Sequence, residues 1–196
     1  MGKVHDHIDP RLTDWIMSQP VFFVGSAPSG EGGHINLSPK GPIGTFRVLD
    51  GHTVAYLDVV GSGAETIAHV RQNGRIVIMF CAFTGPPLIL RLHGSGKIVQ
   101  RGDEGFDRLA ASFDHPESHG GGADRRAVVV VDVHRIADSC GFGVPLMERV
   151  GTRPQAAAWV ENKLRNGGDR ALIDYMIEKN TSSLDGLAAV DAELLG

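Results

Sequence analysis

The stretch GSGAET, residues 61–66, is the first place where this sequence could do chemistry. Ser62 and Glu65 have the spacing of a capping box, in which the two residues hydrogen-bond the first backbone N–H groups of a helix. A helix start also attracts anions, because its free N–H groups carry partial positive charge. The sequence therefore predicts a capped helix start, and it leaves open whether Gly63 and its neighbours also bind a phosphate.

A second candidate is HINLSPKG, residues 34–41. In a strand, Asn36 and Ser38 fall on one face. We expect Pro39 to end regular pairing, because proline lacks an N–H group. Lys40 follows directly, so one amide, one hydroxyl and one ammonium could meet a single ligand. The alternative is an edge strand with a solvated lysine.

Two charged residues interrupt apolar runs. Arg91 lies in PLILRLHG, and Asp58 lies in YLDVV. Charged side chains are rarely buried without a partner. We expect Arg91 to contact either a carboxylate such as Asp58 or a ligand group.

The thiol and imidazole groups give weaker signals. Cys140 lies in DSCGFGVP, which reads as a structural loop and lacks a cysteine-protease signature. The nine histidines show no metal-ligand spacing, so we expect no metal site. His115 and His119 fall in a glycine-rich stretch that we expect to be a mobile surface loop.

The elements that must position these residues are mostly strands. Period-two or continuous apolar runs predict strands near 21–27, 34–38, 45–49, 53–60, 75–83, 87–99 and 127–136. Helical patterns cover 9–18, 65–73, 103–113, 154–166 and 169–180, and the tail after 180 is ambiguous. Because strands mostly follow strands, we predict a mainly β (α+β) fold, a small barrel of about six strands with peripheral helices.

Length and charge narrow the function classes. The chain has 196 residues and a net charge of −4, which gives no electrostatic case for nucleic-acid binding. No apolar run is long enough for a membrane helix. Cys81 and Cys140 form no disulfide framework, so we expect a cytoplasmic protein. We divide the chain into a barrel domain, residues 1–150, and a C-terminal helical extension packed on it, residues 151–196.

Taken in order, these stretches resemble the pyridoxamine 5'-phosphate oxidase-like flavoproteins. HINLSPKG, TVAYLDVVGSGAET, NGR, GPPLILRLHGSGKIV and CGFGVP carry the resemblance, from about Pro20 to about Pro145. It implies a split β-barrel that forms a homodimer, with FMN bound between the subunits. It assigns cofactor contacts to Asn36, Ser38, Lys40, Ser62, Gly63, Thr66 and Arg91, with Tyr56, Leu57 and Asp58 lining the flavin ring.

Two departures from the family pattern matter. Glu65 and Thr66 stand where the true oxidases carry basic residues, and the ending VDAELLG lacks a basic substrate segment. We therefore expect an FMN-dependent oxidoreductase whose small-molecule substrate is unknown. The alternatives are a non-catalytic flavin carrier, a haem protein using His93 or His134, a deazaflavin protein, or a barrel without a cofactor.

Overall fold

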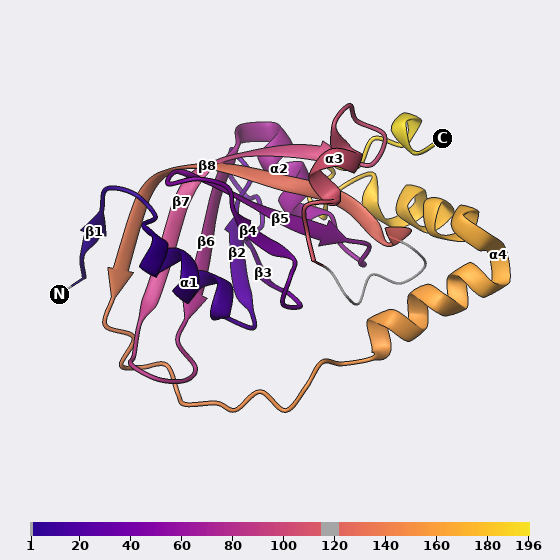
Figure 1. Ribbon diagram of the computed structural model, residues 1–196. Helices are drawn as coiled ribbons and strands as arrows, with labels where there is room; N and C mark the ends of the chain where they lie inside the picture. The colour runs from indigo at the N-terminus through magenta and orange to yellow at the C-terminus, as the bar shows by residue number, and fades with distance from the viewer. Residues whose placement is uncertain (1, 115–121) are drawn as a thin grey trace.

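The computed structural model describes residues 2–114 and 122–196. Eight antiparallel strands in this part of the chain form one sheet, in the order β3-β2-β6-β7-β8-β5-β4, and β1 pairs with β8 (Figure 1). Their bounds are β1 Val4–His5, β2 Phe22–Ser26, β3 Asn36–Lys40, β4 Phe46–Val48, β5 Thr53–Val59, β6 Arg75–Cys81, β7 Ile89–Gln100 and β8 Arg125–Ser139. The predicted runs all contain strands; the two-residue β1 was not predicted.

The sheet curls around an apolar interior. Phe22, Tyr56 and Phe80 from different strands belong to one buried cluster, and the Phe22 ring contacts Tyr56 edge-on and Phe80 in a tilted arrangement. The edge strand β3 approaches β5, where Lys40 binds Asp58 across the opening. The predicted fold, a mainly β split barrel with peripheral helices, is confirmed.

A glycine shapes the two longest strands. The register of β7 against β8 shifts between His93 and Gly94. A side chain at Gly94 would overlap the backbone carbonyl of Asp132 on β8. The strands therefore bend where the sequence offers no Cβ, as the curled sheet requires.

Helices lie around the barrel. Helix α1 spans Pro10–Ser18, and Asp9 caps it as predicted. Helix α2, Glu65–Asn73, ends at Gly74 in the left-handed conformation, also as predicted. Helix α3, Phe106–Ala110, is shorter than expected. Helix α4, Gln155–Asn180, breaks at Gly168, so its two halves correspond to the two predicted helices (Figure 1). A 3₁₀ turn, η2, covers Glu193–Leu195.

The segment after α4 returns to the barrel. Met176, Val190 and Leu195 are buried against Ile67 and other residues of α2. The division at residue 150 stays a prediction, and the expected mobile loop with His115 and His119 lies outside the described residues. None of the described helices has the length and apolar character needed to cross a membrane.

Candidate functional site

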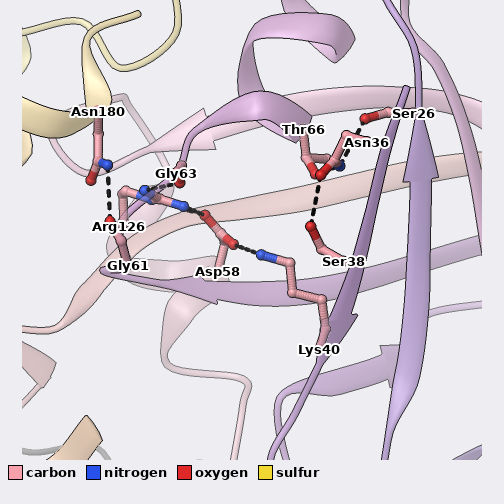
Figure 2. A network of polar contacts seen from close by, with 10 residues as sticks. All are labelled: Ser26, Asn36, Ser38, Lys40, Asp58, Gly61, Gly63, Thr66, Arg126 and Asn180. Atoms are coloured by element: carbon pink, nitrogen blue, oxygen red, sulfur yellow. Dashed lines mark hydrogen bonds and ion pairs between the residues drawn. The ribbon is translucent and has the colours of Figure 1, made fainter. Parts of the chain in front are cut away.

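A polar cleft of about 350 Å³ lies at the mouth of the barrel, between β3, the loop after β5 and the start of α2. Most of the predicted site residues meet here (Figure 2). The cleft is lined by Asn36, Ser38, Lys40, Ser62, Gly63 and Thr66, together with Glu65 and Arg126. Its size is within the range of small-molecule sites.

One face of β3 supplies the polar row along the cleft. Asn36, Ser38 and Lys40 alternate with the exposed Leu37 and Pro39, so the predicted common face is confirmed. The strand pairs through Pro39 to Lys40, contrary to our expectation that proline would end the pairing. Because β3 is an edge strand, the missing N–H of Pro39 costs no ladder bond.

The amide of Asn36 is held at both ends. Its nitrogen donates to the hydroxyls of Ser26 at 3.2 Å and Thr66 at 3.0 Å. Its oxygen accepts from Ser38 at 2.8 Å. On α2, the Nδ1 atom of buried His69 lies 3.0 Å from the Ser26 hydroxyl. Both amide hydrogens are therefore used, and Ser38 retains only acceptor capacity for a ligand.

Three charged groups form the other side of the site (Figure 2). Asp58 accepts from Lys40 Nζ at 2.6 Å through one oxygen. Its other oxygen accepts from Arg126 Nε at 2.9 Å and Nη2 at 2.6 Å. Burial opposes ionisation of Asp58, but the charges of Arg126 and Lys40 outweigh it and lower the pKa of Asp58 from 3.8 to about 2. The carboxylate is therefore ionised at neutral pH.

Sequence reasoning missed Arg126 and gave Asp58 a different neighbour. Arg126 also donates to the carbonyl of Gly63 at 2.9 Å, which fixes the glycine-rich loop. Arg91 instead donates to Ser139 and does not line the cleft. It pairs with Met79 on β6 and Ala137 on β8. For Arg126, the only signal in the sequence was a charged residue at the start of an apolar strand. That signal does not give the register of β8 against β5.

The predicted capping box is wrong. Helix α2 begins at Glu65 with Ala64 as its N-cap and no side-chain cap. The carboxylate of Glu65 accepts from the backbone N–H of Leu184 at 3.0 Å. Nearby, the amide of Asn180 donates to the carbonyl of Gly61 at 2.9 Å. The backbone N–H of Leu184 therefore replaces that of Ser62 as the donor to Glu65, and Ser62 lies two residues before the N-cap.

Two predicted ring-lining residues are buried. Tyr56 lies in the barrel core, and Leu57 packs on α3 in another cluster. Burial raises the pKa of Tyr56 well above 10.0, and the Asp58 carboxylate adds to that rise. Neither side chain lines the cleft.

The remaining reactive groups lie away from the cleft. Cys81 is buried and Cys140 is exposed, and both are free. Burial lowers the pKa of His93, with the charge of Arg135 adding to the effect. In residues 2–114 and 122–196, no group of three or more His, Cys, Asp or Glu side chains could hold a metal ion.

Comparisons with known proteins show the family of this chain. The family model for pyridoxamine 5'-phosphate oxidase matches residues 8–140. The chain is 36% identical over 207 residues to ustO, a pyridoxamine 5'-phosphate oxidase family protein of Aspergillus flavus, covering 99% of this chain and 80% of that protein.

Similar solved structures are more distant. A NimC/NimA family protein from Clostridium acetobutylicum matches with a TM-score of 0.46 and 17% identity, over 68% of this chain and 87% of that one. An FAD-binding protein from Mesorhizobium loti matches with a TM-score of 0.46 and 10% identity, over 70% of this chain and 96% of that one.

Proposed function

Because this chain belongs to the pyridoxamine 5'-phosphate oxidase family, we propose that it binds FMN and acts as a flavin-dependent oxidoreductase on a small-molecule substrate. The observation that carries this proposal is the cleft at the barrel mouth. It combines two cationic side chains, a glycine-rich loop and a row of polar side chains on β3. A phosphorylated, hydroxyl-bearing chain is the ligand chemistry that such a site fits.

The phosphate end of the ligand would lie between Lys40 and the loop with Ser62 and Gly63. The side chain of Lys40 is 23% exposed and the carboxylate of Asp58 only 3% exposed, so Lys40 is the partner that a ligand can reach. Arg126 is buried behind them and fixes Gly63. Charge-assisted hydrogen bonds of this kind are among the strong polar contacts in proteins.

The hydroxylated chain of the flavin would follow β3. Ser38 donates its only hydrogen to Asn36, so it can accept a hydrogen bond from a ligand hydroxyl. The bonds from Asn36 to Ser26 and Thr66 hold this row in place before any ligand arrives. Preorganisation of this kind lowers the cost of binding.

The flavin ring would extend beyond the cleft. Ile35, next to Asn36, lines a neighbouring hollow of about 260 Å³ with Gly25, Val77 and His93. Arg91 faces the same side of β7 as His93, two residues away, so it adjoins this hollow. We place the ring on this outer face of the sheet, against a second copy of the chain.

When bound, the flavin supplies the redox chemistry by accepting and returning a hydride or electrons. The chain's own residues hold the cofactor and exclude water from its phosphate end, and we assign no protein general base. We also place the protein in the cytoplasm, which agrees with its two free cysteines.

Titration with FMN, followed by flavin fluorescence and melting temperature, tests the binding part. We expect saturable quenching and a raised melting temperature, and the absence of both would refute flavin binding. Anaerobic mixing of the loaded protein with NADH or NADPH then separates an oxidoreductase from a carrier. Bleaching of the flavin absorption supports turnover, whereas an unreduced flavin favours a carrier.

A further inference from the structure

The charges at the cleft do not suit a doubly charged ligand. Lys40 and Arg126 contribute two positive charges and Asp58 one negative charge, so the triad has a net charge of about one. Asp58 and Arg126 are only 2% and 3% exposed, so water screens their charges weakly. Glu65 lines the same cleft, although Leu184 hydrogen-bonds its carboxylate.

A phosphate monoester carries between about −1.5 and −2 charges at pH 7, with a second pKa near 6. A dianion bound to this triad would exceed its positive charge by about one, beside two charged side chains that are almost fully buried. Unpaired buried charge is costly. A monoanion would neutralise the triad and avoid that cost.

We propose that Asp58 makes this cleft selective for a phosphate group with a single negative charge, so that a phosphate monoester binds together with one proton. The proposal rests on the proposed function and deepens it. Lys40 would be shared between Asp58 and the ligand, while Arg126 stays paired with Asp58 through two hydrogen bonds.

The other titratable groups around Asp58 do not replace this role. Tyr56, on the same strand, stays a neutral phenol at these pH values because burial raises its pKa. On α2, Glu65 is a further negative charge at the cleft, and His69 is hydrogen-bonded to Ser26. Tyr56 therefore leaves the net charge of the three-residue cluster unchanged, and Glu65 makes the region more negative.

The central test compares FMN with riboflavin, which lacks the phosphate, at pH 6 and pH 8. With a second phosphate pKa near 6, FMN affinity should fall roughly 50-fold from pH 6 to pH 8, whereas riboflavin affinity should change little.

In Asp58→Asn the triad keeps two positive charges, so the loss of FMN affinity between the two pH values should shrink to a few-fold. Asp174→Asn, an exposed carboxylate paired with Arg170, is the matched control and should behave as the wild type. Equal FMN affinity at both pH values, or an undiminished loss in Asp58→Asn, would overturn the proposal.

A measurement on the unaltered protein covers the case in which Asp58→Asn fails to fold. Calorimetric titration with FMN at pH 8, in two buffers of different ionisation enthalpy, should show uptake of about one proton per FMN. Zero proton uptake would overturn the proposal.

If FMN binds at neither pH, the proposed function fails, and inorganic phosphate becomes the probe. A larger rise in melting temperature with phosphate at pH 6 than at pH 8 would then support charge selection, and no such difference would refute it.

Discussion

Asp58 continues the inward-facing row that Val54 and Tyr56 begin on β5. At the barrel mouth, apolar side chains no longer cover this row. Lys40 from β3 and Arg126 from β8 contact Asp58 there instead. The residue that looked anomalous in the sequence is therefore the last member of a regular alternation. Its burial is tolerated because both carboxylate oxygens are paired.

Replacement of Lys40 by alanine should weaken FMN binding about 10- to 100-fold, because hydrogen bonds to charged groups contribute about 1.5–3 kcal/mol. Riboflavin affinity should change little. Fluorescence titration with both ligands measures the difference, and Lys97→Ala, an exposed lysine on β7, is the matched control. Unchanged FMN affinity in Lys40→Ala would show that the phosphate lies elsewhere.

Asp58 should also shape acid stability. Its pKa is lowered from 3.8 to about 2 in the folded protein, so its stabilising effect is fully present above pH 3.8 and is lost as pH falls through about 2. The contribution is on the order of 2 kcal/mol. Urea unfolding at pH 5, 3 and 2 should show a steeper loss for the wild type than for Asp58→Asn. Parallel losses in the two proteins would contradict the assignment.

The residue-level predictions succeeded where local pattern was enough. The common face of Asn36, Ser38 and Lys40 follows from strand alternation alone. Arg126 could not be found, because its pairing with Asp58 depends on a β5–β8 register that changes at Asp58/Val59. The same uncertainty let Arg91 appear as a partner for Asp58, although it contacts Ser139.

At the scale of elements, the start of α2 shows how a distant segment overrides a local signal. Ser62 and Glu65 have capping-box spacing, yet Leu184, more than a hundred residues away, binds the Glu65 carboxylate. The end of α2 depended only on Gly74, and it was predicted correctly. A helix end that depends on a single glycine in the left-handed conformation can be predicted from sequence, whereas an end that depends on tertiary contacts cannot.

The bend between β7 and β8 provides a test at the same scale. Gly94→Ala places a methyl group against the carbonyl of Asp132, so we expect a loss of about 2 kcal/mol or more in the free energy of unfolding. Chemical denaturation measures it. Gly143→Ala, at a position with nothing within 4 Å, should be close to neutral. A neutral Gly94→Ala would show that the two strands can separate without cost.

For the whole molecule, we expect a homodimer. Large apolar side chains are exposed on β3, just before it, and on the extended segment after β8, including Leu37, Ile35, Phe142, Leu146 and Val150. Such a set on one chain indicates a contact surface. Light scattering after gel filtration should give twice the chain mass of 20.9 kDa, with or without FMN. A monomer that still binds FMN would refute the subunit-interface site.

The fold as a whole could be predicted, because alternation and glycine punctuation mark nearly every strand. The particular contacts of the segment after α4 could not be predicted, because the Gln100 side chain on β7 bonds the backbone N–H and carbonyl of Asp191, and such bonds leave no periodic signal. These contacts join the last part of the chain to the end of β7, a strand in the middle of the sheet.

The packing of the segment after α4 against the barrel gives the protein an order of assembly during synthesis. The strands of the barrel leave the ribosome well before Asn180, Leu184 and Asp185, which hold Gly61, Glu65 and His34. A nascent chain can therefore form the apolar interior, and the bond from Arg126 to Gly63, before the cleft loop gains its contacts with the C-terminal segment. Under the proposed function, FMN would therefore meet a complete cleft only after these residues have been translated.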